Sequence, residues 1–253
     1  MTSNAAAASE SSKAAEVLAP GKATALVIGA SGGLGAALVA ALSSEGAFSQ
    51  VLGLSRSTVP AIDYANEASL AESAAWVAAQ CEAQQAPFRL VIVATGFLHG
   101  ESGQPERSWS QLDPAYLRQV LEVNTIGPAL VMKHFLPLLP KTGRCVAGFV
   151  SARVGSIGDN ALGGWYGYRA AKAALNQLVK TASIELKRRN PQALCVALHP
   201  GTVATALSAP FSKTGLNVRT PDVAASELLA ALASLDASHS GHLIDYQGQV
   251  LPW

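Results

Sequence analysis

The strongest constraint on the fold is an alternation of short apolar runs with longer stretches that have the length of helices. Five runs have the character of buried strands, because they are apolar and largely flanked by Gly, Pro or polar residues: 24–28, 50–54, 90–94, 144–150 and 194–198. Four stretches between them are long enough for crossover helices: 34–44, 69–84, 114–136 and 168–189. This alternation predicts an α/β fold, a doubly wound parallel sheet with helices on both faces.

The composition favours one large domain. The chain has 253 residues, of which 49% are hydrophobic and 14% are charged, so it can bury a sizeable core. Residues 1–20 are low in complexity and end at Pro20, and we expect them to form a mobile tail. No second change of composition marks a linker, so residues 21–253 are expected to fold as a single domain.

Charge, cysteines and hydropathy argue against several classes of function. The net charge of +1 disfavours a nucleic-acid groove, which relies on clustered Lys and Arg. Cys81, Cys145 and Cys195 form no CxxC pair, and no cluster of His, Asp and Glu has metal-ligand spacing. No apolar run reaches the ~18 residues needed to cross a bilayer, and the N terminus resembles no signal peptide. We therefore expect a cytoplasmic protein without a metal, a nucleic-acid partner or a membrane segment.

A glycine-rich turn follows the first predicted strand, in the segment Gly29-Ala30-Ser31-Gly32-Gly33-Leu34-Gly35. A strand, a glycine turn and a helix start form an anion site, because free backbone N–H groups and the positive helix end face the ligand. Gly29 can make the tight turn, Gly33 can admit a pyrophosphate, and Gly35 can let helix and strand pack closely. The spacing is GxxxGxG rather than the GxGxxG of the commoner dinucleotide fingerprint.

The same segment contains G-x-S-x-G, the nucleophile elbow of an α/β-hydrolase, with Ser31 as the nucleophile. An elbow normally follows several strands, whereas this turn follows the first, and the elbow leaves Gly35 unexplained. We favour phosphate binding and keep a serine hydrolase as an alternative.

Arg56 follows the second predicted strand, in Leu54-Ser55-Arg56-Ser57. Sites selective for NAD carry an acidic residue in this region that binds the ribose 2′-hydroxyl, and no carboxylate is present here. An arginine can instead pair with a 2′-phosphate. The sequence therefore favours NADP(H) as the cofactor, with NAD(H) as the alternative.

Tyr168 and Lys172 are four residues apart, so they lie on one face of the predicted helix. A protonated lysine beside a phenol lowers the phenol pKa by favouring the phenolate, which makes a usable proton donor. A YxxxK pair is frequent by chance, and it gains weight here because it lies downstream of a glycine turn.

Four motifs together resemble the short-chain dehydrogenase/reductase family over residues 22–253: the glycine turn, Asn124 in VNTIGP, the Tyr168–Lys172 pair, and His199-Pro200-Gly201-Thr202-Val203. The segment SARVGSIGDNALGGWYGYRAAK is most similar to the C-factor-like branch and to some carbonyl reductases. The resemblance implies a single Rossmann domain with about seven parallel strands. It also implies hydride transfer between NAD(P)H and a small-molecule carbonyl or alcohol, in a homodimer or homotetramer.

The resemblance implies catalytic roles for three residues. Tyr168 would protonate the carbonyl oxygen, Lys172 would lower the tyrosine pKa and bind the nicotinamide ribose, and Asn124 would hold a water. The alternative for Asn124 is a polar residue that relieves a helix kink at Pro128.

The resemblance also implies cofactor contacts. Asp63 is similar to the acidic residue that contacts adenine after the family's third strand. The turn at residues 200–203, with Thr205, resembles the loop that holds the carboxamide. The full set of predicted cofactor residues is Gly29, Ser31, Gly33, Leu34, Gly35, Arg56, Asp63, Ala94, Gly96, Tyr168, Lys172, Pro200, Gly201, Val203 and Thr205.

The sequence departs from the family pattern at two places. The family's Asn-Ala-Gly is Ala94-Thr95-Gly96 here, so one side-chain hydrogen bond is expected to be missing. The substrate-orienting serine usually begins S-x-x-G, and Ala152 occupies that register before Gly155. We favour Ser151 as the catalytic serine, on condition that the strand has ended or bulges there. Ser156, or no serine at all, is the alternative.

Other residues bear on the substrate side. His99 either lines the substrate mouth or is a surface-loop histidine, and Trp165 and Tyr166 pack either over the substrate or in the core. Residues 206–220 lie where family members carry a mobile substrate lid. Ala152 also keeps open a function of another class, an NAD(P)-binding protein that signals or regulates with little catalysis.

Overall fold

The computed structural model describes residues 22–253 except 45, 47, 102 and 212–216. The tail predicted at residues 1–20 lies outside the described residues, as do residues 212–216 of the predicted lid.

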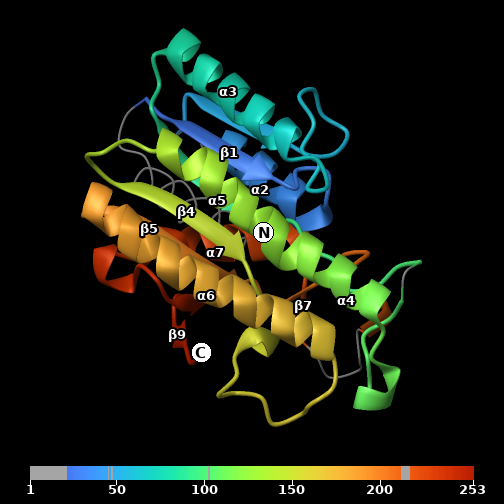
Figure 1. Cartoon of the computed structure of the whole chain (residues 1–253). Helices are drawn as coiled ribbons and strands as arrows, with labels where there is room; N and C mark the ends of the chain where they lie inside the picture. The colour runs from blue at the N-terminus through green and yellow to red at the C-terminus, as the bar shows by residue number, and fades with distance from the viewer. Residues whose placement is uncertain (1–21, 45, 47, 102, 212–216) are drawn as a thin grey trace, which may run out of the picture.

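A seven-stranded sheet forms the centre of the molecule, with the strands in the spatial order β2-β1-β3-β4-β5-β8-β9 (Figure 1). All neighbouring strands in it are parallel except β8 and β9, which pair antiparallel. The fold class is confirmed, with one antiparallel edge strand where an all-parallel sheet was expected. The strands of the sheet are β1 (Thr24–Ile28), β2 (Gln50–Leu54), β3 (Phe88–Val93), β4 (Cys145–Val150), β5 (Ala193–His199), β8 (Leu243–Asp245) and β9 (Val250–Leu251). A separate small pair is formed by β6 (Thr202–Val203) and β7 (Val218–Arg219).

Helices cover both faces of the sheet, as Figure 1 shows. The α-helices are α2 (Gly33–Ser44), α3 (Glu67–Gln84), α4 (Pro114–Leu121), α5 (Gly127–Phe135), α6 (Tyr166–Arg189) and α7 (Pro221–Ser234). Successive residues of β1 point into different layers, because Cβ atoms alternate along a strand. Ala25 and Val27 pack with α2 and α7, whereas Leu26 and Ile28 pack in the core beneath α3, α5 and α6. Both faces of the strand are therefore apolar, as its sequence predicted.

The stretch predicted as one helix at 114–136 is divided. It starts as expected, because the Asp113 carboxylate accepts the N–H of Tyr116 at 2.8 Å and Pro114 is the first helical residue. A π-helical turn (Glu122–Ile126) then separates α4 from α5. Pro128 has no N–H to donate to the Asn124 carbonyl one turn earlier, so the regular helical ladder cannot continue there.

The segment before Asp63 contradicts one expectation from the family pattern. Residues 55–66 form turns and a loop between β2 and α3 instead of a third strand. The Thr58 hydroxyl bonds to the carbonyl oxygens of Ser55 and Pro60 at 2.9 and 2.7 Å. Such local side-chain bonds compete with strand pairing, and Pro60 cannot donate to a ladder.

The strand order reverses beside β1, which has β2 on one side and β3 on the other. A crevice forms at such a point, beyond the carboxyl ends of the strands, because the connecting chains leave in opposite directions. The glycine turn after β1 and residues 94–96 after β3 both lie at this edge.

Candidate active site

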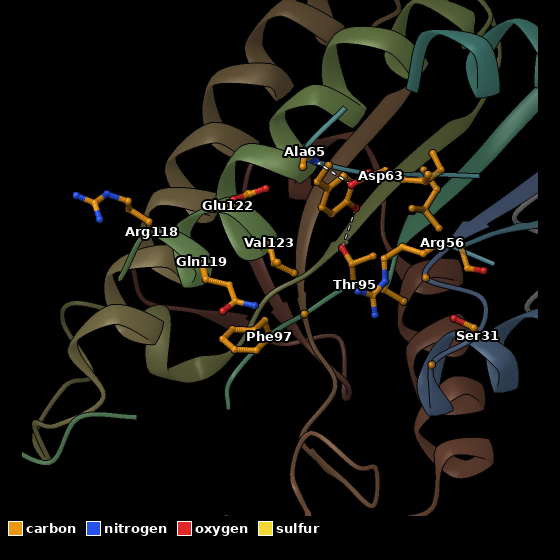
Figure 2. Close-up of a pocket in the computed structure, with 18 of the residues that line it drawn as sticks. Ser31, Arg56, Asp63, Ala65, Thr95, Phe97, Arg118, Gln119, Glu122 and Val123 are labelled. Carbon is orange, nitrogen blue, oxygen red and sulfur yellow. Dashed lines mark hydrogen bonds between the residues drawn. The ribbon is translucent and has the colours of Figure 1, made fainter. Parts of the chain in front are cut away.

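A cavity of about 690 Å³ opens at the edge of the sheet where β1 and β3 end. Figure 2 shows it running from Ser31, Arg56 and Asp63, past Thr95, to Phe97 and Gln119. Six predicted cofactor residues line it: Gly29, Ser31, Arg56, Asp63, Ala94 and Gly96. Residues distant in sequence thus share one cavity, as a dinucleotide site requires.

The glycine turn has the close contacts that its sequence predicted. Gly29 has φ +93°, and a Cβ there would lie 2.9 Å from the backbone of Ala94. A Cβ on Gly35 would lie 2.1 Å from the Gly29 carbonyl oxygen, so Gly35 lets α2 pack against the end of β1. The first turn of α2 carries no acidic residue. A pyrophosphate therefore fits this helix terminus without charge repulsion.

Gly33 and Leu34 lie at the start of α2 but are not among the residues that line the cavity. A Cβ on Gly33 would come within 3.0 Å of the Thr205 methyl group, so the two predicted cofactor segments are in contact. Leu34 is buried in the core beside α2.

Arg56 and Asp63 lie on the cavity wall formed by the loop after β2. The Arg56 side chain is exposed, and among the described residues no carboxylate lies within ion-pair distance of it. Its guanidinium is therefore available to bind a phosphate. Asp63 accepts a hydrogen bond from the N–H of Ala65 at 3.0 Å, which fixes its carboxylate at the rim.

Tyr64 and Thr95 form a contact that the sequence did not indicate. Their hydroxyl oxygens are 2.9 Å apart, and the Tyr64 ring packs on Gly127 at the start of α5. Burial raises the pKa of Tyr64 well above its ordinary value. The bond joins the loop after β2 to the end of β3, close to where the family's asparagine is replaced by Ala94. In the sequence, this contact could have been indicated by Thr95, which carries a hydroxyl where the family's Asn-Ala-Gly has alanine.

Tyr168 and Lys172 lie one turn apart near the N terminus of α6, and both are buried, 7% and 2% exposed. Lys172 Nζ is 5.7 Å from the centre of the Tyr168 ring and donates to the Val150 carbonyl at 2.9 Å. A Cβ on Gly155 would lie 2.7 Å from the Lys172 Cβ, so only glycine permits this approach of the loop after β4.

Burial shifts the pKa values of this pair in directions that oppose the expectation of a protonated lysine that acidifies the phenol. Burial lowers the pKa of Lys172 to about 7. Burial also raises the pKa of Tyr168, and the neighbouring Tyr116 phenol adds to that shift. Because a buried site disfavours every charged form, both groups are driven toward neutrality. Tyr168 thus holds its proton at neutral pH.

Asn124 is fully buried in the π-helical turn and ties it to the loop after β3. Its Nδ2 donates to the carbonyls of Phe97 and Val120 at 2.7 and 2.9 Å, and its Oδ1 accepts the N–H of Phe97 at 3.2 Å. The side chain therefore stabilises the irregular turn, and π-turns recur at functional sites.

Aromatic side chains belong to the same packed cluster as Tyr168. The Trp165 ring lies edge-on to Tyr168 and to Phe211, with centroid distances of 6.2 and 5.1 Å. His99 lies edge-on to Phe211 at 5.5 Å, and its Nε2 is 3.1 Å from the Ala206 carbonyl oxygen. His99 thus joins the loop after β3, to which it belongs, to the segment after β6. Tyr166 is exposed.

The loop at residues 200–205 is held by the β6–β7 pair. Gly201 has φ +73° and lies against the Arg219 guanidinium, which stacks 3.6 Å from the Tyr246 ring centre. Pro200 and Val203 are buried beside it, and Thr205 reaches the glycine turn. The carboxamide contact expected of this loop stays a prediction.

The sequence itself matches a known family over most of its length. Residues 23–215 match the family model for short chain dehydrogenases. The chain belongs to the short chain dehydrogenase family. This confirms the family expected from the motifs.

Relatives and solved structures agree with this membership. The chain is 36% identical over 142 residues to 1-hydroxy-2-glutathionyl-2-methyl-3-butene dehydrogenase of Rhodococcus sp. strain AD45, covering 56% of this chain and 61% of that protein. It is 34% identical over 143 residues to C-signal of Myxococcus xanthus, covering 56% of this chain and 81% of that protein. The second match agrees with the predicted C-factor-like branch.

The fold matches carbonyl reductases. The NADPH-bound carbonyl reductase from chicken fatty liver superposes with a TM-score of 0.77 at 23% identity, over 92% of this chain and 100% of that chain. Carbonyl reductase Sniffer of D. melanogaster gives 0.78 at 23% identity, over 91% of this chain and 99% of that chain.

The two serines expected near Tyr168 are occupied elsewhere. β4 ends at Val150, so the strand has ended at Ser151, but the Ser151 hydroxyl is 3% exposed and donates to Asn176 Oδ1 at 2.7 Å. Ser156 is also buried and accepts the N–H of Asp159 at 3.1 Å. Ala152, at the family's serine register, packs against the cluster that contains Tyr168.

The serine hydrolase alternative finds no support in the geometry. The cavity that contains Ser31 has no histidine among the described residues that line it, so the base of a serine hydrolase is not at hand. Within the described chain, no group of three His, Cys, Asp or Glu residues could hold a metal ion. No helix in that part of the chain is both long and apolar enough to span a membrane.

Proposed function

We propose that the protein is an NADP(H)-dependent oxidoreductase that reduces the carbonyl of an aldehyde or ketone, or oxidises the matching alcohol. The observation that carries this proposal is the buried Tyr168–Lys172 pair, one turn apart on α6 and tied to the end of β4 by the bond from Lys172 to the Val150 carbonyl. The cavity lined by the glycine turn and Arg56 opens at the same edge of the parallel sheet, although neither Tyr168 nor Lys172 is among the described residues that line it. A phenol that keeps its proton can pass it to a carbonyl oxygen, and Tyr168 is the general acid and base in this assignment.

NADP(H) would be held by the glycine turn at its pyrophosphate and by Arg56 at its 2′-phosphate. Asp63 would contact the adenine and Lys172 the nicotinamide ribose. The bound nicotinamide supplies or accepts the hydride. The chicken carbonyl reductase binds NADPH in its solved structure, and a short-chain dehydrogenase/reductase of Burkholderia multivorans binds NADP, which supports this choice of cofactor.

The side chains that pack around Tyr168 support one substrate class. Trp165, Phe211 and Phe97 are apolar, and Ala152 adds no hydroxyl. Such a wall favours a carbonyl carried on an apolar or aromatic group, because it offers contact area and few hydrogen bonds.

The experiment is a titration with NADPH and NADH, followed by fluorescence of the bound nicotinamide, and then NADPH oxidation across a panel of carbonyl compounds. We expect tighter binding of NADPH, turnover of aromatic aldehydes or ketones, and loss of turnover in Tyr168→Phe with cofactor binding retained. Lack of affinity for either nucleotide would refute the proposal.

A second candidate is a nucleotide-binding protein that signals or regulates with little catalysis. Ala152 in the serine register and the Ser151–Asn176 bond favour it, since Ala152 has no hydroxyl and the Ser151 hydroxyl already donates to Asn176. Nucleotide binding without turnover on the whole panel would select this function over the reductase.

A further inference from the structure

The helix that carries Tyr168 and Lys172 begins without a capping side chain of its own. Trp165 precedes its first residue, in the left-handed region at φ 53° and ψ 43°, and makes no side-chain cap. The first N–H groups of a helix lack partners within it, and a bulky residue in this region is strained. Residues outside α6 must therefore provide the hydrogen bonds that stabilise its N terminus.

Glu106 supplies those contacts from the loop between β3 and α4. Its carboxylate oxygens are 3.1 and 3.2 Å from the Gly167 nitrogen, which donates to them. Its backbone carbonyl accepts the N–H of Trp165 at 2.5 Å. One residue thus binds the terminus on both sides of Tyr166.

The Glu106 carboxyl group is buried, with 2% of the residue exposed. Among the described residues no Lys, Arg or His forms an ion pair with it. A buried carboxylate is stable only where N–H donors or a positive field offset its lost hydration, and a helix N terminus provides both. The position of Glu106 and that of the helix start therefore depend on each other.

The space around Gly167 is closed. A Cβ there would lie 3.0 Å from Leu117 and 3.1 Å from Glu106 Oε1, so the first turn of α6 fits between them without slack. Tyr168 is the next residue. Its backbone continues directly from this turn, so the placement of its phenol depends on how the turn is held.

We propose that Glu106 is a positioning residue that fixes the first turn of α6, and with it the Tyr168 phenol and the Trp165 ring. This inference rests on the proposed function only for its effect on turnover. A displacement of about 1 Å in a reacting group can reduce a rate by roughly 100-fold.

The test compares Glu106→Gln, Glu106→Asp and Glu106→Ala with the unsubstituted protein. Asp236→Asn is the matched control, because the Asp236 carboxylate also caps a helix start, that of residues 237–239. Asp236 lies near Arg144, at the amino end of β4. The readouts are thermal unfolding, NADPH affinity, kcat and KM, and an ultraviolet titration of tyrosine ionisation. Subtracting the titration of Tyr168→Phe isolates the ionisation of Tyr168 from that of the other four tyrosines.

In Glu106→Gln we expect NADPH affinity within about two-fold of the original and kcat lower by roughly 10- to 100-fold. Tyr168 should ionise at lower pH, because a loosened first turn of α6 admits water to the phenol, and burial is what raises the pKa of Tyr168. Glu106→Asp keeps a carboxylate but is one methylene shorter, so its kcat and its Tyr168 ionisation should both lie between those of Glu106→Gln and the unsubstituted protein. Asp236→Asn should change neither the kcat nor the ionisation of Tyr168.

An unchanged Tyr168 ionisation in Glu106→Gln would overturn the inference. So would equal losses of NADPH affinity and kcat, which would mark Glu106 as a purely structural residue. If Glu106→Ala does not fold, the Gln and Asp variants carry the comparison. Absence of turnover in the unsubstituted protein would refute the reductase alone, because the ionisation readout needs no substrate.

Discussion

Arg56 and Lys172 are two cationic side chains of the site with opposite environments. Arg56 is exposed and has no carboxylate partner in the described chain, so its full charge is available to a ligand. Lys172 is enclosed, and burial lowers its pKa to about 7. The identity of both residues was visible in the sequence, but their charge states depend on burial, which the sequence did not reveal.

Arg56→Asp should reverse the cofactor preference. A hydrogen bond to a charged group contributes about 1.5–3 kcal/mol, so the affinity for NADPH should fall roughly 10- to 100-fold while that for NADH is retained or improved. Arg118→Asp is the control, since Figure 2 shows Arg118 across the cavity from Arg56. Fluorescence titration measures both affinities, and an unchanged ratio in Arg56→Asp would contradict the assignment.

Lys172 should make folding stability depend on pH. Its pKa is about 7 when folded and 10.5 when unfolded, so the unfolded chain binds more protons between these values. The free energy of unfolding should therefore rise as pH increases from about 7 toward 10, by an amount on the order of a few kcal/mol.

Urea unfolding at several pH values in that range measures this slope. Lys172→Met should flatten the slope, whereas Lys187→Met, at an exposed position of the same helix, should preserve it. If Lys172→Met has the same slope as the unsubstituted protein, a group other than Lys172 causes the pH dependence.

At the scale of elements, sequence patterns predicted buried strands and most helices well. Asp113 and Pro114 start α4, and Asn190 follows the last residue of α6, just before Pro191, as predicted. The sequence did not predict the π-turn, the loop that replaces a strand before Asp63, or β8 and β9. These features depend on contacts between residues distant in sequence, or are too short to show a periodic pattern of apolar residues.

Gly127→Ala tests one such distant contact. Alanine in a helix normally stabilises it by about 0.5–1 kcal/mol relative to glycine. Here the added Cβ would lie 2.0 Å from the Tyr64 ring, so we expect a net destabilisation of about 1–3 kcal/mol and weaker NADPH binding. Denaturant unfolding provides the measurement. In a Tyr64→Ala background the same substitution should cost less, and strictly additive losses would contradict the contact.

The family resemblance predicts a homodimer or homotetramer, and apolar side chains are exposed on the π-turn and on α6. Ile126 in the π-turn is 51% exposed and Ile184 on α6 is 47% exposed. We expect light scattering after gel filtration to give the mass of a dimer or tetramer. Ile184→Glu should lower that mass, because a buried unpaired charge opposes association. Ile157→Glu, in a loop where the side chain is 78% exposed, should leave it unchanged, and equal behaviour of the two variants would argue against this interface.

The sequence by itself determined the fold class, the glycine turn and the spacing of Tyr168 and Lys172, because strand alternation, glycine geometry and helical period are local properties. Only the tertiary structure decided which groups face each other. It brings Asn176 to Ser151, Ala152 to the Tyr168 cluster and Glu106 to the start of α6. Those pairings, and the pKa shifts that burial produces, arise from packing between segments whose relative placement no local pattern encodes.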